Sequence, residues 1–307
     1  MSTLTTHTTA SRDSHSIGLC KFNTTNKAIE VSDGTNWTLY NNDGFYMSPI
    51  TNRYAVDFDG TNEYMSIPDQ DIFSLGNGSG TDNAFSISGW FNADSIGTFY
   101  IATKDATGAR EWSFRTISSQ LTFFAFGTGG GYIGRQYTTA LSTGQWYHAV
   151  VTYDGSKASS GIKLYLNGSQ VDNADAASGT YTAAVNTSTE LRVGALQYNN
   201  TYSNGKIDEV AIFDYELSLP DVNSLRNTDG AYPKPTSAAL LNPVGYWRMG
   251  DNDGGTGDTI TDQGITYDPT ANGGAGGYVA SGNNGTLTNP PPYHDLSTAP
   301  DSIYVAP

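Results

Sequence analysis

The stretch Gly161-Ile-Lys-Leu-Tyr-Leu-Asn167 decides the fold class of this chain. Its apolar residues begin at Ile162 and occupy every second position, with Lys163 and Tyr165 between them. Successive side chains of a β-strand point to opposite faces of a sheet, so this alternation predicts a strand with one buried face.

Similar strand-length runs, separated by turns rich in Gly, Asn and Asp, extend from Arg53 to about Asn227. The series predicts an all-β sandwich of two antiparallel sheets. One helix is predicted at Ser218, where a capping side chain is followed by Pro220 and Asp221. The predicted strands cover residues 54–58, 84–91, 98–103, 111–116, 120–126, 145–153, 161–167, 190–196 and 205–213.

The composition excludes several classes of partner. Of 307 residues, 30 are acidic and 15 are Lys or Arg, and the resulting formal charge of -15 would repel a nucleic-acid backbone. No apolar stretch approaches the length of a membrane span, and residues 1–16 lack the apolar run of a secretion signal. The single cysteine, Cys20, cannot form an internal disulfide. We therefore expect no nucleic-acid partner, no membrane partner and synthesis in a cytosol.

The chain is predicted to have three parts. Residues 1–50 form an N-terminal arm, in which β-like runs at 17–22, 27–31 and 37–40 predict a hairpin or a small meander. Residues 51–228 form the sandwich. Residues 229–307 are rich in Gly, Asn and Pro, and they contain islands of order near 244–249 and 258–262, of which 244–249 carries too much apolar and aromatic surface to remain in water.

Four stretches follow one another in a family-like order and spacing: Tyr54-Ala-Val-Asp-Phe-Asp-Gly-Thr-Asn-Glu-Tyr-Met-Ser-Ile-Pro68, Phe85-Ser-Ile-Ser-Gly-Trp-Phe91, Gly144-Gln-Trp-Tyr-His-Ala-Val-Val-Thr-Tyr-Asp-Gly155 with Leu164-Tyr-Leu-Asn-Gly168, and Leu191-Arg-Val-Gly194 with Gly205-Lys-Ile-Asp-Glu-Val210. Through these stretches, residues 53–227 resemble the laminin-G-like branch of the concanavalin A-like lectin/glucanase superfamily. The resemblance implies a jelly roll of two stacked sheets, in agreement with the alternation.

The two ends of the chain carry further resemblances. Residues 244–251, 258–262 and 283–287 look like the opening strands that precede the domain in this family. Here they follow it, which implies a jelly roll completed in a permuted order, in the same subunit or in a neighbour; a decayed second repeat is the alternative. Residues 19–37 are similar to hairpin motifs of tailed-phage structural proteins.

Catalysis is not expected. The related glucanases place their catalytic carboxylates on one face of a strand, which requires even spacing. The nearest acidic pair here is Asp208-Glu209, whose adjacent side chains should point to opposite faces. The histidines are scattered, and His148 lies in a strand where a packed role is expected. We therefore predict that the protein is not an enzyme.

The resemblance also implies a structural Ca²⁺ at the edge of the sandwich. The matching positions are Asp59 and Asp208, with Asn62 and backbone carbonyls completing the ligand set. Oxygen ligands of this kind suit Ca²⁺. The alternative is that Asp59 caps its own turn and Asp208 bonds to the backbone.

Aromatic residues near the predicted loops and edges are candidates for stacking on sugar rings or for packing in an interface between proteins. The sequence does not choose between these two roles. The candidates are Tyr100, Trp112, Tyr132, Tyr137, Tyr198 and Tyr202.

Our leading hypothesis is a non-enzymatic virion structural protein of a tailed phage, such as a capsid decoration, fibre or appendage subunit. Such a protein would lie in the virion, contact other virion proteins, form a homo-oligomer and bind a host-surface glycan. The alternative is a carbohydrate-binding module of a bacterial surface or secreted protein.

Overall fold

The computed structural model describes residues 5–7, 20–23, 28–32, 37–40, 52–226, 241–251, 253–268, 277–296 and 302–303. The chain divides into two units, Met1–Ile50 and Thr51–Pro307. Parts of the predicted arm, such as residues 17–19, and of the predicted tail, such as residues 227–240, lie outside the described residues.

The described residues of the first unit form a four-stranded sheet in the order β1-β2-β3-β4. Strand β1 pairs in parallel with β2, and the other pairs are antiparallel. Strands β2, β3 and β4 lie where the sequence predicts a meander, and β1 adds an edge that the sequence did not predict. The strands are β1 (Thr5–His7), β2 (Cys20–Asn23), β3 (Ala28–Ser32) and β4 (Trp37–Tyr40).

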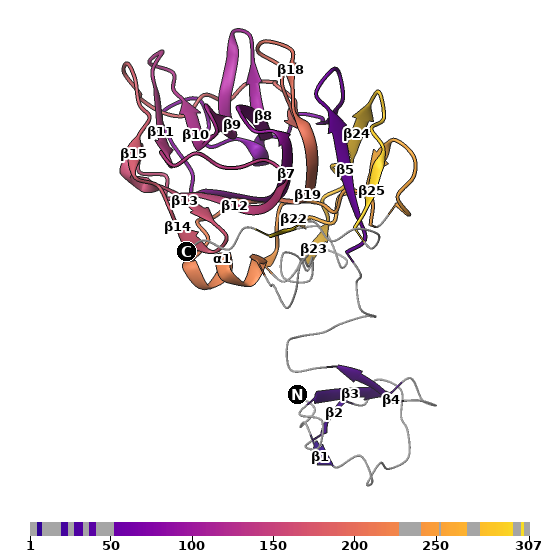
Figure 1. Ribbon diagram of the computed structural model, residues 1–307. Coiled ribbons are helices and arrows are strands. Elements are labelled where there is room, and N and C mark those ends of the chain that lie inside the picture. Colours follow the sequence, from indigo (N-terminus) through magenta and orange to yellow (C-terminus); the bar gives the residue numbers. More distant parts are fainter. Residues whose placement is uncertain are drawn as a thin grey trace. The chain divides into compact units, whose positions relative to one another are not determined.

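The second unit is built on two large sheets, which confirms the predicted all-β sandwich (Figure 1). The first sheet has the order β14-β13-β12-β7-β19-β5-β25, with β20 joined to β19 and β26 joined to β12. Its strands are β5 (Tyr54–Asp59), β7 (Phe85–Ser95), β12 (Gln145–Tyr153), β13 (Ile162–Leu166), β14 (Ser169–Gln170), β19 (Asn204–Phe213), β20 (Gly245–Trp247), β25 (Tyr293–Asp295) and β26 (Ser302–Ile303).

The second sheet has the order β15-β11-β10-β9-β8-β16-β6-β24-β21. Its strands are β6 (Tyr64–Ile67), β8 (Thr98–Ala106), β9 (Ala109–Ile117), β10 (Gln120–Phe126), β11 (Tyr132–Gln136), β15 (Ala174–Asp175), β16 (Leu191–Val193), β21 (Thr259–Ile260) and β24 (Gly285–Thr288). Two further hairpins are β17 (Ala195–Leu196) with β18 (Thr201–Tyr202), and β22 (Ile265–Asp268) with β23 (Gly277–Ala280).

The main core lies between the two sheets, because every second residue of each strand points inward. Phe91 of the first sheet stacks on Phe99 of the second, with ring centroids 5.3 Å apart, and Phe85 packs against Trp112 at 5.8 Å. The C-terminal segment contributes five buried side chains to this core, namely Val244, Trp247, Met249, Ile260 and Leu287.

Strands from the C-terminal segment occupy regular places in both sheets. β19 is flanked on one edge by β5, which pairs with Asn204–Ile207, and then by β20, which pairs with Val210–Ile212. β24 pairs with β6, and β25 pairs with β5, beside which it lies in yellow in Figure 1. The segment after residue 240 therefore extends sheets whose other strands come from the middle of the chain.

The outer face of the first sheet is covered by the helix α1 (Leu219–Arg226). The helix begins as predicted, since the backbone N–H of Ser218 donates to Asp221 at 3.0 Å and the backbone N–H of Asp221 donates back to the Ser218 hydroxyl. Val222 and Leu225 then pack on outward residues of the sheet. Among the described residues, no helix has the length and apolar character needed to span a membrane.

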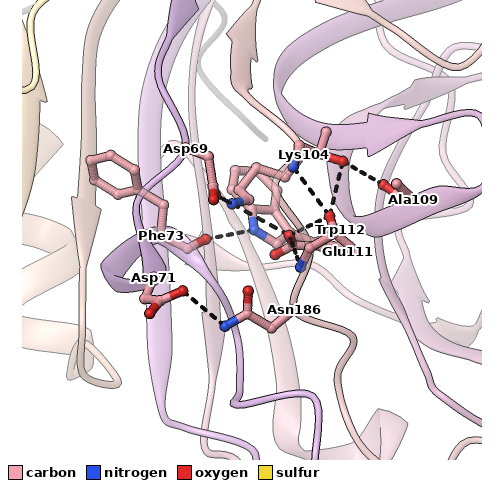
Figure 2. A network of polar contacts seen from close by, with 10 residues as sticks. Asp69, Asp71, Phe73, Lys104, Ala109, Glu111, Trp112 and Asn186 are labelled. Carbon is pink, nitrogen blue, oxygen red and sulfur yellow. Dashed lines mark hydrogen bonds and ion pairs between the residues drawn. The ribbon is translucent and has the colours of Figure 1, made fainter.

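A buried polar network fixes the loops at one end of the second sheet (Figure 2). The fully buried Lys104 forms ion pairs with Asp69 and, at 3.4 Å, with Glu111. Glu111 accepts hydrogen bonds of 2.8 Å from the backbone N–H and the hydroxyl of Thr187. Trp112 donates from its indole N–H to the carbonyl oxygen of Phe73 at 2.8 Å.

Short 3-10 helical turns are formed by Asp71–Phe73 and by Ser159–Gly161.

Candidate functional site

The outer face of the second sheet carries aromatic rings and arginines, and the β17–β18 hairpin covers part of it. Cross-strand pairing places Tyr100, Arg115 and Thr122 in one outward row, since Phe114 and Phe123 of the next row point into the core. We call one group of these outward residues the aromatic–arginine surface. It consists of Arg110, Arg115, Phe124, Phe126, Tyr132 and Tyr198.

The rings of this surface are packed edge to face. Phe124 and Tyr132 are perpendicular, with centroids 5.1 Å apart, and Phe126 lies 5.8 Å from Tyr132. Phe124 and Tyr132 are half-buried, whereas Phe126 is buried beneath them. In this arrangement the rings of Phe124 and Tyr132 each stay partly in contact with solvent.

Two arginines lie over these rings. The Arg110 guanidinium is 3.8 Å from the centroid of Phe126 and 4.5 Å from that of Tyr198, whose side chain is 39% exposed. Arg110 also donates two hydrogen bonds, of 2.7 and 2.9 Å, to Asp105. Arg115 lies 5.3 Å from the centroid of Phe124. Burial lowers the pKa of Arg115.

The β17–β18 hairpin lies on the outward side of β8 and borders the surface (Figure 1). The Thr103 hydroxyl donates to the carbonyl of Ala195 at 2.8 Å, and the hydroxyl of Ser203 accepts from the backbone N–H of Tyr100 at 2.7 Å. Tyr198 of the hairpin faces Arg110. The aromatic–arginine surface is therefore bounded by this hairpin on the β8 side.

A second aromatic pair joins the hairpin to strand β6. Tyr202 stacks on Tyr64 with centroids 6.1 Å apart, and Arg192 lies 4.1 Å from the centroid of Tyr64. Arg192 forms an ion pair with Glu190 at 2.6 Å. The two tyrosines come from β6 and the hairpin, and Arg192 comes from β16. This group shares no residue with the aromatic–arginine surface.

Two of the aromatic residues predicted from the sequence cannot stack on a ligand. Trp112 is fully buried in the main core, because it lies in the same inward series as Phe114. Tyr100 is 4% exposed, because Thr201 and Ser203 of the hairpin lie over it. For both, the prediction of a binding residue was wrong.

The other four predicted aromatic residues keep some exposure but do not form one group. Tyr132 and Tyr198 belong to the aromatic–arginine surface, and Tyr202 belongs to the second pair. Tyr137 packs against the main core. The sequence reasoning missed Phe124 and Arg115, although their alternation with Phe123 and Phe114 marks them as outward.

A laminin-G-type family model, described as the concanavalin A-like lectin/glucanases superfamily, matches residues 59–223. The chain belongs to this superfamily. The resemblance predicted from the four sequence stretches is therefore confirmed. No curated protein matches the chain significantly.

One solved structure reaches a TM-score of 0.50 and agrees with this assignment at the level of the fold. A candidate carbohydrate-binding protein from Bacteroides ovatus aligns with a TM-score of 0.50 and 20% identity, over 82% of this chain. The chain spans 62% of the length of that protein. A heptameric SAP-like pentraxin from Limulus polyphemus aligns with a TM-score of 0.37 and 14% identity, over 60% of this chain and 86% of the pentraxin. The LG4-5 domains of mouse laminin alpha1 align with a TM-score of 0.37 and 15% identity, over 54% of this chain and 42% of the laminin chain.

The residues predicted to bind calcium do not come together. Asp59 pairs across the sheet with Asn204, and Asp208 lies four residues further along β19, about 13 Å away. Asp59 accepts from the backbone N–H of Thr61 at 2.7 Å, and Asn62 accepts through its carbonyl from Asn289. Among the residues that the structure describes, no three His, Cys, Asp or Glu side chains are grouped to hold a metal. A shared site for these residues is thus contradicted, while calcium binding itself stays a prediction.

Asp208 and Glu209 point to the same face of the first sheet, and the prediction of opposite faces was wrong. The pairing of β19 with β7 shifts between Asp208 and Ala211, and Glu209 has a φ of 52°. This is a β-bulge, in which one extra residue breaks the alternation. The bulge lies where the neighbour of β19 changes from β5 to β20.

The bulge builds a buried cluster of three carboxylates around Arg248. The arginine is 3.3 Å from Glu209 and 2.9 Å from Asp251, and the hydroxyl of Tyr246 donates to Glu209. Asp208 accepts from the Glu209 N–H and from the Asn52 amide, both at 2.8 Å. Burial raises the pKa of Glu209 to about 7 and that of Asp251 to about 6, with Arg248 opposing both.

His148 has the packed role that the sequence predicts. It is buried on the outer side of the first sheet, 2.9 Å from the hydroxyl of Ser88, and its ring lies 5.0 Å from that of Trp90. Burial lowers the pKa of His148 to about 3. The imidazole is therefore neutral at physiological pH.

Proposed function

We propose that this chain is a non-enzymatic carbohydrate-binding protein whose ligand lies on the aromatic–arginine surface. The observation that carries the proposal is the partial exposure of Phe124, Tyr132 and Tyr198 beside two arginines, on a part of the sheet face bordered by the β17–β18 hairpin. Ring faces offer apolar area to the C–H face of a sugar, and guanidinium groups donate hydrogen bonds to its hydroxyls.

The fold family supports the same class of ligand. The chain shares the concanavalin A-like lectin/glucanases superfamily fold, and the Bacteroides ovatus structure with a TM-score of 0.50 is a candidate carbohydrate-binding protein. The carboxylates Asp208 and Glu209 are buried and engaged with Asn52, Tyr246 and Arg248, which gives them a structural role. These observations favour binding without hydrolysis.

The test is binding of the full chain to a glycan array, followed by affinity measurements with single variants. Phe124→Ala and Tyr132→Ala should each weaken binding by about tenfold, because each removes a stacking ring. Tyr64→Ala is the matched control, since it removes a half-buried tyrosine of the same sheet on the far side of the hairpin. Unchanged affinity in both ring variants, or no binding to any arrayed glycan, would contradict the proposal.

The separate first unit favours a second candidate, a virion structural protein of a tailed phage. Met1–Ile50 has its own sheet, as an attachment module would. In this role the unit would mount a homo-oligomer on other virion proteins of the capsid or tail, and the jelly roll would contact a host-surface glycan. Proteomics of purified phage particles tests the role, and absence of the chain from the particles would end it.

A further inference from the structure

Arg115 lies near the half-exposed ring of Phe124 and the buried ring of Tyr100. It extends from β9, with its guanidinium carbon 5.3 Å from the centroid of Phe124 and 5.9 Å from that of Tyr100. Its row across the sheet contains Tyr100 and Thr122, neither of which is anionic. The side chain is half-buried, and its Nε is buried without a hydrogen-bond acceptor.

Arg115 differs from the other arginines of this sheet face in its charge balance. Arg110 forms an ion pair with Asp105, and Arg192 forms one with Glu190. Among the residues that the structure describes, no carboxylate lies within ion-pair distance of Arg115. Asp105 is near enough to raise its pKa, but both oxygens of that carboxylate are bonded to Arg110.

Arg115 hydrogen-bonds with Tyr100, but a partly desolvated cation with no carboxylate partner is unexpected in this composition. The chain has 30 acidic and 15 basic side chains, so carboxylate partners are abundant. Burying part of a charge without a partner is unfavourable, and the lowered pKa of Arg115 reflects this. A ligand that supplies the missing negative charge would therefore gain from a site that is already formed.

We propose that the glycan bound by this surface is acidic, and that a carboxylate or sulfate group on one of its sugars pairs with Arg115. This inference rests on the proposed carbohydrate-binding function. The planar guanidinium offers two parallel donors, which match the two oxygens of such a group. The neighbouring rings of Phe124 and Tyr132 would then hold the adjacent sugar rings by stacking.

The experiment compares polysaccharides that differ only in charge, using the full chain. Polygalacturonate and its methyl ester form the carboxylate pair, and a sulfated galactan and its desulfated form make the sulfate pair. The wild-type protein should bind the charged member of one pair at least about tenfold more tightly. Arg115→Gln should abolish that preference while binding of the uncharged member persists.

Two further variants separate recognition of the charge from damage to the fold. Arg192→Gln is the matched control, since it removes a ring-stacked arginine that already has a carboxylate partner, and it should keep the preference. Arg115→Lys keeps the positive charge but loses the planar fork, so it should retain only part of the preference. Thermal unfolding of each variant establishes that it is folded.

The outcomes distinguish this inference from the proposed function. Equal binding of charged and uncharged glycans by the wild-type protein would overturn the inference while the carbohydrate-binding function stands. A charge preference that survives Arg115→Gln in a folded variant would also overturn it. Failure of the wild-type protein to bind any glycan would remove the proposed function, and the inference with it.

Discussion

The two sheets of the jelly roll differ in how their outer faces are finished. The outer face of the first sheet is covered by α1 and by residues near Leu296, and its buried carboxylates Glu209 and Asp251 pair with Arg248. The outer face of the second sheet leaves Phe124 and Tyr132 half-exposed and Arg115 without a carboxylate. A face that serves stability is covered and paired, whereas a face left uncovered and unpaired is suited to a ligand.

The largest effect is expected from shortening the chain to residues 1–228. The C-terminal segment places Val244, Trp247, Met249, Ile260 and Leu287 in the main core. Loss of one such side chain costs about 2–5 kcal/mol, so loss of all five, about 10–25 kcal/mol, equals or exceeds the stability of a typical domain, roughly 5–15 kcal/mol. Calorimetry should show no cooperative unfolding transition for the shortened chain.

A matched control for this truncation is a chain that ends at residue 296. It loses β26, whose backbone pairs with β12 at only two positions, and it keeps all five core side chains. This control should unfold cooperatively close to the full-length temperature. A shortened 1–228 chain that melts with the full-length protein would show that the segment after residue 240 does not complete the fold.

The next largest effect is expected from Arg248→Met at pH 7. The substitution leaves Glu209 and Asp251 buried without their cation, and breaking a buried ion pair in this way costs about 3–5 kcal/mol. The loss should shrink at pH 5, because burial raises the pKa of both carboxyl groups and they are then protonated. Arg192→Gln changes a buried arginine of the other sheet whose partner Glu190 is partly exposed, so it should lower stability less.

Chemical denaturation at pH 7 and pH 5 measures the loss of unfolding free energy in Arg248→Met and in Arg192→Gln. A loss in Arg248→Met that is equal at the two pH values would contradict the buried carboxylates as its cause. A loss no greater than that of Arg192→Gln would contradict the cluster as a stabilising element of the closed face.

A smaller effect is the dependence of wild-type stability on pH. Burial raises the pKa of Glu209 from an ordinary 4.5 to about 7, so the folded state binds more protons than the unfolded state between these values. Stability contributed by this group is therefore present below pH 4.5 and is lost as the pH rises through 7. The loss is on the order of 3 kcal/mol.

Glu209→Gln should flatten this part of the profile, because the amide does not ionise. Glu216→Gln, which alters a partly exposed carboxylate paired with Lys163, is the matched control and should keep the slope. His148 acts in the opposite direction: its lowered pKa makes stability fall as the pH drops from 6.5 towards about 3. Because these two slopes oppose one another, the decisive comparison is between variant and wild type: a Glu209→Gln profile with the same slope as the wild-type profile between pH 4.5 and 7 would contradict the burial of Glu209.

The sequence predicts the sandwich well because alternation is a local property. The inward position of Trp112 also follows from alternation, and its assignment as a binding residue overlooked that signal. The bulge at Asp208 and Glu209 does not follow from alternation, because it depends on the change of neighbour from β5 to a strand of the C-terminal segment. Tyr100 is buried by a hairpin of residues 195–203, a contact between distant segments that the local pattern does not contain.

The smallest effect is expected from removing residues 1–50. This unit has its own sheet, and the second unit keeps Asn52 bonded to Asp208 and the backbone N–H groups of Arg53 and Tyr54 bonded to Asp251. The unfolding temperature of residues 51–307 should therefore equal that of the second unit in the full chain, and glycan affinity should be unchanged. Differential scanning calorimetry and the glycan array measure both. A fall in the unfolding temperature like that of the 1–228 chain would mean that the first unit stabilises the jelly roll, and that it is not the independent attachment module that a virion role requires.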